Sequence, residues 1–132
     1  MKSGFMVLDG ERKMYKAING YTKAKMIEKI LKYNNGTKAS NDEGNCFYED
    51  SRSNRCAIGC FIPDEHIKVA KSIYGGIGAL MLDMPYLNSH MPLEPEGLEE
   101  LQGVHDCFCN YNILDRTLHG ELVRWVYLNV KD

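Results

Sequence analysis

Three kinds of side chain that can do chemistry, a thiol, an imidazole and carboxylates, are available to form a nucleophilic site. In such a site Cys56 would attack a substrate, His105 would take its proton, and Asp106 or Asp64 would orient the imidazole ring. The positive charge of Arg55 next to Cys56 would favour the thiolate. These residues predict a small cysteine-dependent hydrolase or transferase as one function. The alternative is structural, because a cysteine followed by apolar residues is more often a small buried hydrophobic residue, and no oxyanion hole can be identified in the sequence.

The same residues could instead bind a metal. Cys56 and Cys60 are four residues apart, as are His105 and Cys109, and this spacing places two side chains on one side of a helix. Together they would supply three thiolates and one imidazole for a structural zinc ion. The spacing differs from the tighter pairs of zinc knuckles, so zinc is kept as an alternative and no other cofactor is expected.

A third kind of site is a binding surface on the polar turn from Glu49 to Arg55. Charged groups cannot be buried without partners, so we expect this turn to face solvent or a ligand. Arg52 and Arg55 offer planar donor pairs for phosphate or carboxylate, and Tyr48 and His105 could supply stacking and hydrogen bonds beneath them. The partner would be a protein or a small anionic ligand.

Composition excludes several other classes. The 132 residues carry 16 basic and 18 acidic side chains, a net charge of −2, without a basic tract of the kind that follows nucleic-acid phosphates. The lysines at positions 23, 25, 29 and 32 are interpreted as a solvated helix face. No apolar run reaches the roughly 20 residues that cross a bilayer, and charges follow the start too closely for a signal peptide. We therefore expect a cytoplasmic protein without a disulfide framework; homo-oligomerisation stays open.

These residues must be positioned by an α+β domain. Two short runs of strand-forming residues flank the polar turn, which predicts a short central β-hairpin from Cys46 to Ile62 packed against three to four helices. The second arm of this hairpin could instead form a helical turn. Residues 1–20 are predicted to be an N-terminal extension or a hairpin at Asp9-Gly10, and residues 21–132 a single domain.

Helical periodicity indicates where the core lies. A first helix is predicted over Tyr21–Tyr33 with Thr22 as its cap, a second after Pro63, a third from Pro95 with His105 facing the interior or a cleft, and a last one over Asp115–Leu128. The segment from Tyr86 to Pro95 is predicted to be a loop, and one further helical turn from Ile77 to Leu82 is an open alternative before it. The residues expected to be buried are Ile27, Ile30, Leu31, Ile58, Ile67, Leu98, Leu101, Leu118, Leu122 and Trp125.

Three motifs resemble a family of small uncharacterised proteins encoded by bacteriophages and prophages. The family pattern is C-x-Y, then C-A-(I/V)-G-C-(L/F)-I-P-D-E, then L-Q-x-V-H-D, and it is matched here by Cys46–Tyr48, Cys56–Glu65 and Leu101–Asp106. The resemblance covers Tyr21–Val130. It implies a phage-encoded accessory protein that acts by binding in the cytoplasm of an infected or lysogenic bacterial host. This class includes counter-defence inhibitors that sequester a host protein or a small nucleotide-like signal.

The chain departs from the family pattern at two places. Phe61 stands where the family has leucine, and Cys107 and Cys109 are added after the His-Asp pair. The added thiols argue against a zinc site common to the family. The resemblance implies instead that His105 and Asp106 pair with Cys56 or Tyr48, which would fix the fold or shape a pocket.

Overall fold

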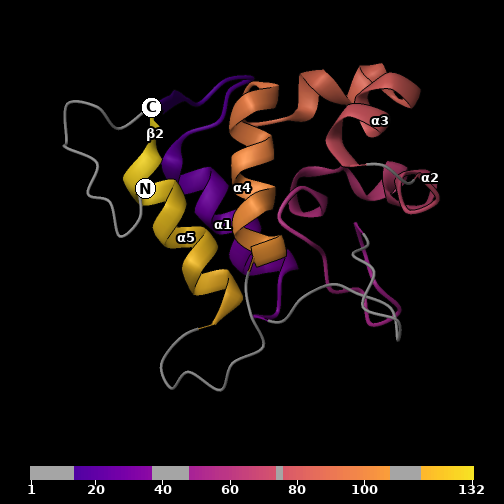
Figure 1. The fold of residues 1–132 in the computed structure, drawn as a ribbon, viewed down its shortest axis with the longest axis horizontal. Coiled ribbons are helices and arrows are strands. Elements are labelled where there is room, and N and C mark those ends of the chain that lie inside the picture. Colours follow the sequence, from indigo (N-terminus) through magenta and orange to yellow (C-terminus); the bar gives the residue numbers. More distant parts are fainter. Residues whose placement is uncertain (1–13, 37–47, 74–75, 108–116) are drawn as a thin grey trace.

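The structure, a computed structural model, describes residues 14–36, 48–73, 76–107 and 117–132. Helices predominate among these residues, accompanied by two very short strands (Figure 1). In chain order the elements are β1 (Tyr15–Lys16), α1 (Lys23–Tyr33), the 3-10 turns η2 (Gly59–Phe61) and η3 (Asp64–His66), α2 (Ile67–Ala70), α3 (Gly76–Asp83), η4 (Pro85–His90), α4 (Pro95–Cys107), α5 (Leu118–Asn129) and β2 (Val130–Lys131). Helices α1, α4 and α5 pack together on one side, and α2 and α3 lie on the other.

Helix α1 forms as its sequence predicts. The hydroxyl oxygen of Thr22 accepts a hydrogen bond from the Lys25 amide at 3.2 Å, which satisfies one of the free amides of the first turn. Met26 and Ile30, four residues apart, are fully buried. The helix ends where Asn34 takes an extended conformation while its amide still bonds to the Ile30 carbonyl. Capping and periodicity thus fix this helix locally.

The predicted central hairpin is wrong. The strands are β1 and β2, which pair in parallel with Tyr15 opposite Val130, so the sheet joins segments near the two ends of the chain. In the described part of the predicted hairpin, a single antiparallel bridge joins Glu49 to Arg55. The following residues form the 3-10 turn η2, which is the helical alternative for the second arm. Cys46 and Phe47 lie outside the described residues.

Local hydrogen bonds explain why this segment turns instead of extending. The Cys60 amide donates to the Cys56 carbonyl at 3.1 Å, and the Gly59 amide donates to the Cys56 sulfur at 3.3 Å. Gly59 also lets two backbones approach closely, because a Cβ on this residue would collide with the carbonyl oxygen of Tyr48. A strand pairing would have to break these contacts.

The remaining helices lie where they were predicted, but some of them are shorter than predicted. Helix α4 begins at Pro95 as expected, and α5 begins after Thr117, whose hydroxyl accepts from the Gly120 amide at 3.1 Å. The predicted second helix consists of η3 followed by the single turn of α2. The predicted loop before Pro95 contains the 3-10 turn η4, and Leu87, Met91 and Leu93 from this region are buried in the core.

Most of the predicted core is confirmed. Leu31 is an exception at 53% exposure, because it is displaced by about 100° around α1 from the buried Ile30. Ile27 and Trp125 are only partly buried against the core. The expected residues that are buried are Ile30, Ile58, Ile67, Leu98, Leu101, Leu118 and Leu122.

Tyr15 belongs to this core although it lies in the predicted N-terminal extension. Its ring stacks on Trp125 with centroids 5.8 Å apart, and its hydroxyl donates a hydrogen bond to Glu100. Burial raises the pKa of Tyr15, and the hydrogen bond to Glu100 raises it further. The part of residues 1–20 that the structure describes therefore packs against the helices.

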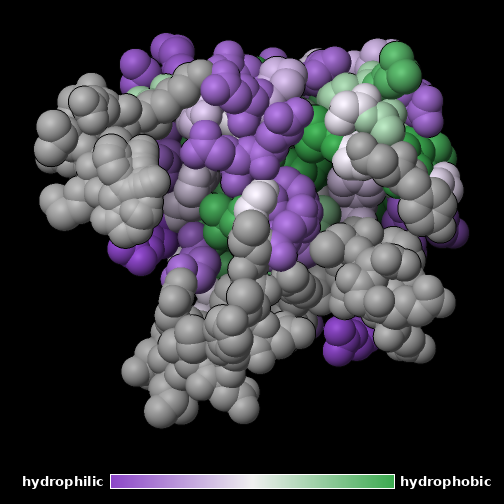
Figure 2. Space-filling view, viewed as in Figure 1, coloured by the Kyte–Doolittle hydropathy of each residue, from purple (hydrophilic) through white to green (hydrophobic). Residues whose placement is uncertain are grey.

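On the face that Figure 2 shows, the surface over α2 and α3 is more apolar than the surface over α4. Figure 2 shows hydrophobic side chains gathered there, whereas hydrophilic residues cover α4. Val69, Leu82 and Tyr86 are 54%, 81% and 49% exposed. Among the described helices, none combines the length and the apolar character that crossing a bilayer requires.

Candidate functional site

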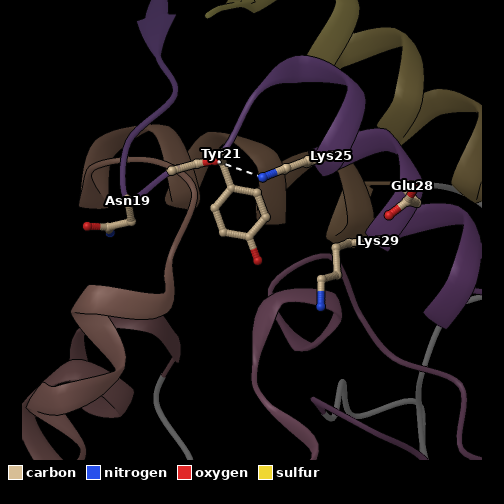
Figure 3. Close-up of a pocket in the computed structure, with 6 residues that line it drawn as sticks. Asn19, Tyr21, Lys25, Glu28 and Lys29 are labelled. Atoms are coloured by element: carbon tan, nitrogen blue, oxygen red, sulfur yellow. Dashed lines mark hydrogen bonds between the residues drawn. The ribbon is translucent and has the colours of Figure 1, made fainter.

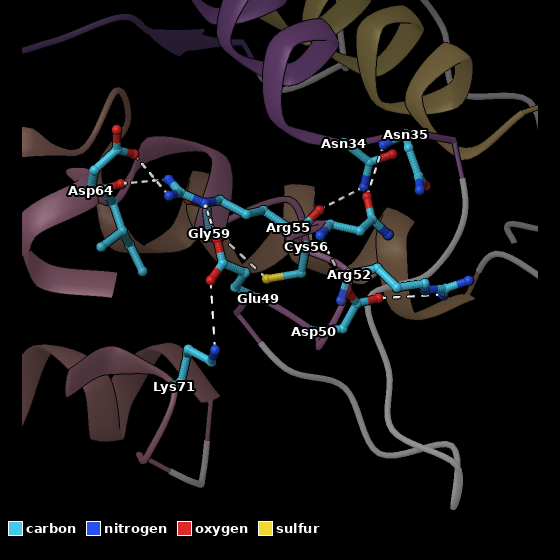
Figure 4. Close-up of polar contacts among 12 residues, drawn as sticks. Asn34, Asn35, Glu49, Asp50, Arg52, Arg55, Cys56, Gly59, Asp64 and Lys71 are labelled. Atoms are coloured by element: carbon cyan, nitrogen blue, oxygen red, sulfur yellow. Dashed lines mark hydrogen bonds and ion pairs between the residues drawn. The ribbon is translucent and has the colours of Figure 1, made fainter. Parts of the chain in front are cut away.

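Arg55 lies inside the protein and connects several parts of residues 49–64 (Figure 4). Its Nε donates to Glu49 at 3.1 Å and one terminal nitrogen donates to Asp64 at 2.8 Å. The other terminal nitrogen donates to the carbonyls of Ile62 at 3.0 Å and Gly59 at 3.4 Å. The planar guanidinium therefore holds the turn and η2 together, as a fork of fixed donors can.

The same residue is joined to the end of α1. Its guanidinium carbon lies 4.3 Å from the centroid of the Tyr33 ring, a cation–π geometry, and its amide donates to the Tyr33 carbonyl at 3.0 Å. The Asn34 side chain donates to the Arg55 carbonyl at 2.6 Å. Arg55 is only 4% exposed. The expectation that Arg55 faces solvent is wrong, because carboxylates, carbonyls and an aromatic ring of the chain itself compensate its charge.

In the rest of the polar turn, Asp50 is buried and Arg52 is exposed. Asp50 is 3% exposed, and its carboxylate accepts hydrogen bonds from the amides of Arg52 and Asn54 at 2.8 and 3.1 Å. The expectation that Asp50 faces solvent is therefore wrong. Arg52 does face solvent, with a side chain that is 65% exposed and a 3.4 Å contact to Asp50. Of the two arginines predicted to bind a partner, Arg52 is the accessible one.

The predicted nucleophilic residues are buried. Cys56 and His105 are 1% and 0% exposed, and Tyr48 is 9% exposed. His105 Nδ1 lies 3.2 Å from the Asp106 carboxylate, which is the orienting contact that the sequence suggests. Asp64, the other residue considered for that role, is bonded to Arg55 instead.

Gln102, a residue not predicted from the sequence to take part in the site, links this pair to η2. Its amide nitrogen donates to Asp106 at 3.0 Å and its oxygen accepts from the Ile58 amide at 3.2 Å. Burial raises the pKa of Tyr48, and the nearby Cys56 and Asp106 raise it further. The structure therefore places Tyr48 within electrostatic reach of both residues. The spacing of Gln102 and Asp106, four apart on α4, is the signal that could have revealed the contact.

The metal candidates are only partly described. Cys56 and Cys60 are buried thiols, and burial raises the pKa of Cys60, with Cys56 nearby as a further cause. Cys109 lies outside the described residues. Within the part of the chain that is described, no three or more His, Cys, Asp or Glu side chains form a group that could hold a metal ion.

A groove of about 360 Å³ opens along the first half of α1 (Figure 3). Its volume is within the usual range for small-ligand sites. The residues that line it are Asn19, Gly20, Tyr21, Lys25, Glu28 and Lys29. In Figure 3, Lys25 and Lys29 lie near the Tyr21 ring, whereas Glu28 lies farther from it.

The floor of the groove is held in place by a tight turn. Asn19 and Gly20 have φ angles of 56° and 81°, and the Tyr21 amide donates to the Ile18 carbonyl at 3.0 Å, as in a type I′ turn. The Tyr21 ring meets Phe61 edge-to-face at 86° with centroids 5.7 Å apart. Burial raises the pKa of the Tyr21 hydroxyl. A partly buried aromatic ring of fixed orientation therefore forms one wall.

The lysines of this face carry positive charge that no carboxylate of the described residues pairs with. The Lys25 ammonium donates to the Gly20 carbonyl at 3.4 Å, and the ammonium groups of Lys29 and Lys32 lie over the Tyr33 ring. From the sequence alone, these lysines are interpreted as a solvated face. The signal that could have identified them is the spacing of four between Tyr21, Lys25, Lys29 and Tyr33, which aligns two aromatic and two basic residues along one side of a helix.

Comparison with known protein families, curated proteins and solved structures finds no match for this chain. The candidate site is therefore defined by its own geometry. That geometry offers an open basic groove on α1 and a buried polar cluster between η2 and α4.

Proposed function

We propose that the chain is a phage-encoded accessory protein that acts by binding a small anionic, nucleotide-like ligand in the groove of α1. The observation that carries this proposal is the groove itself, which Lys25 and Lys29 line together with Tyr21 and where neither lysine forms an ion pair among the described residues. Ammonium groups supply charge and donors for a phosphate, and an aromatic wall suits a base. Sequestering such a ligand would be the action of a counter-defence inhibitor.

Geometry favours this groove over the polar turn. Arg55 and His105 are buried, and the donors of Arg55 are engaged by the chain itself. Arg52 remains an accessible cation that a host protein could use. Lys25 and Lys29, by contrast, border an open volume and share it with an aromatic ring. The groove therefore combines charge, shape and access in one place.

Calorimetric titration with adenosine monophosphate at low salt tests the proposal. The variant Lys25→Gln/Lys29→Gln should weaken binding by about tenfold, since each exposed charge contact is worth up to about fivefold. The control Lys68→Gln/Lys131→Gln removes the same charge from two exposed lysines far from the groove residues in sequence. Equal weakening by both variants, or no binding by the wild type, contradicts the proposal.

A cysteine-dependent hydrolase that uses Cys56 and His105 is the second candidate. The contact of His105 Nδ1 with Asp106 favours it, because a carboxylate that orients the ring is part of such a site. In this function Cys56 should react quickly with iodoacetamide near neutral pH, and His105→Ala should slow the reaction. Slow labelling that His105→Ala leaves unchanged removes the support for this function.

A structural zinc site is the third candidate, drawing on Cys56, Cys60, His105 and Cys109. A bound zinc ion would make the stability of the protein sensitive to chelators. Elemental analysis of protein purified without added metal, together with melting in EDTA, tests it. Less than about half an equivalent of zinc per chain, with unchanged melting, contradicts this function.

A further inference from the structure

Two lysines at the end of α1 share one aromatic ring. The ammonium nitrogens of Lys29 and Lys32 lie 5.7 and 5.2 Å from the centroid of the Tyr33 ring, both within cation–π range. The ring attracts each ammonium group, so two like charges lie around the same aromatic side chain. Like charges held near each other repel, and a bound anion relieves that repulsion.

The nearby carboxylates of the described residues do not neutralise this pair. Asp64 is close enough for Lys32 to lower its pKa, but the hydrogen bond from Arg55 is the larger cause and occupies its oxygen at 2.8 Å. Glu28 is four residues before Lys32 on the same helix, yet it forms no ion pair there. Arg55 also approaches Tyr33, but Glu49 and Asp64 compensate its charge. Lys29 and Lys32 therefore remain available to an anion.

We infer that Lys29 and Lys32, positioned by Tyr33, form a second anion subsite that continues the groove. This inference rests on the proposed function of the groove, where Lys25 and Lys29 receive the first phosphate. Lys25 and Lys32 are seven residues apart, which places them about 10 Å apart along the helix axis. The ligand class is therefore a nucleotide with two separated phosphates, such as a nucleoside bisphosphate. Lys29 lies between the two subsites.

The roles within this second subsite differ. Lys32 contacts the second phosphate, whereas Tyr33 acts as a positioning residue that gathers the two ammonium groups. The hydroxyl of Tyr33 is used elsewhere, in a hydrogen bond with Asp64 that helps to lower the pKa of that carboxyl. The ring alone should therefore suffice for the binding effect, and Tyr33→Phe should preserve it. Tyr33→Leu, which removes the ring, should not.

Calorimetric titration with adenosine monophosphate and adenosine 3′,5′-bisphosphate tests the inference at several salt concentrations. The wild type should bind the bisphosphate about fivefold more tightly than the monophosphate, as one further exposed charge contact allows. Lys32→Gln should abolish this ratio and leave the monophosphate affinity unchanged. Tyr33→Leu should also abolish the ratio, and because Tyr33 positions Lys29 as well, it should weaken monophosphate binding too. Lys32→Gln should also reduce the salt dependence of bisphosphate binding, because one fewer cation engages the ligand. Tyr33→Phe and the exposed control Lys68→Gln should retain the full ratio.

The outcomes separate this inference from the groove proposal. A bisphosphate that binds no more tightly than the monophosphate, or a ratio that survives Lys32→Gln, overturns the second subsite; monophosphate binding that depends on Lys25 would still support the groove. Monophosphate binding that is absent or independent of Lys25 overturns the proposed function instead. Because Tyr33 also packs on Arg55, Tyr33→Leu could reduce folding. The comparison of Lys32→Gln with Tyr33→Phe decides the matter without it.

Discussion

Replacing Arg55 by alanine should destabilise the fold by about 4 kcal/mol. The change removes the donor to the Ile62 carbonyl and leaves the Glu49 carboxylate, which is only 15% exposed, with the longer 3.6 Å ion pair to Lys71 alone. Removing one partner of a buried pair costs about 3–5 kcal/mol, most of it from the group left behind. The bond to Asp64 adds under about 1 kcal/mol, since that side chain is 74% exposed. The cavity beside Tyr33 acts in the same direction.

Urea unfolding followed by circular dichroism measures this loss directly. Arg52→Ala is the matched control, because it removes the same kind of side chain from a position three residues earlier. The Arg52 side chain is 65% exposed, so its loss should cost less than about 0.5 kcal/mol. Arg55→Lys should still cost more than half of this stabilisation, because an ammonium group cannot reach all the acceptors that the planar guanidinium bonds. Similar midpoints for Arg52→Ala and Arg55→Ala would refute the structural role of Arg55.

Three further changes test the packing and the electrostatics of the same region. Gly59→Ala should cost at least about 2 kcal/mol by urea unfolding, since its Cβ would collide with the Tyr48 carbonyl, whereas Gly78→Ala in open space on α3 should stabilise by about 0.5–1 kcal/mol. Burial raises the pKa of the Cys60 thiol, so its contribution to stability is complete below the unfolded pKa of about 8.5 and is lost as pH rises above it. Cys60→Ala should therefore flatten the alkaline part of a plot of urea midpoint against pH. An unchanged plot would count against a neutral buried thiol. The hydrogen bond from the guanidinium lowers the pKa of Asp64, so its stabilisation is present above about pH 4 and lost as pH falls through the folded pKa; Asp64→Asn should make the acidic part of the same profile shallower, and an equal slope in both proteins would contradict this.

The elements that could be predicted from sequence are those whose determinants are local. Thr22 caps α1, Pro95 opens α4, and the apolar residues of each helix repeat at helical spacing. His105 was predicted to face the interior or a cleft from the same periodicity, and it is fully buried. In these places a short window of sequence contains the hydrogen-bond partners and the packing face, so no knowledge of distant residues is needed.

The errors arise where distant residues decide. The pairing of Tyr15 with Val130 joins segments 115 positions apart, and no local pattern announces it. The predicted hairpin failed because strand-forming residues around Cys56 are overridden by the approach of Gly59 to the Tyr48 carbonyl. Short apolar runs do not distinguish a strand from a helical turn, so tertiary contacts settle the choice.

In the candidate site, too, the type of a charged residue does not reveal whether it is buried or exposed. An arginine in a polar turn suggests a solvent-facing cation, yet Arg55 is buried because Glu49, Asp64 and two carbonyls converge on it. Its sequence neighbourhood contained the two carboxylates, but not the turn that brings both to one guanidinium. Conversely, lysines on a helix are most often solvated, and Glu28 among them reinforced that interpretation.

What changes the interpretation of the α1 lysines is the surface against which they are placed. The turn at Asn19 brings Tyr21 beside Lys25, and Tyr33 lies four residues beyond Lys29, so that aromatic rings flank the basic residues at both ends. A solvated lysine gains little from a fixed position, because water screens its charge and its side chain loses rotamer freedom when held. Two ammonium groups gathered on one ring, beside an open groove, are instead arranged to gain from a ligand that brings the opposite charge.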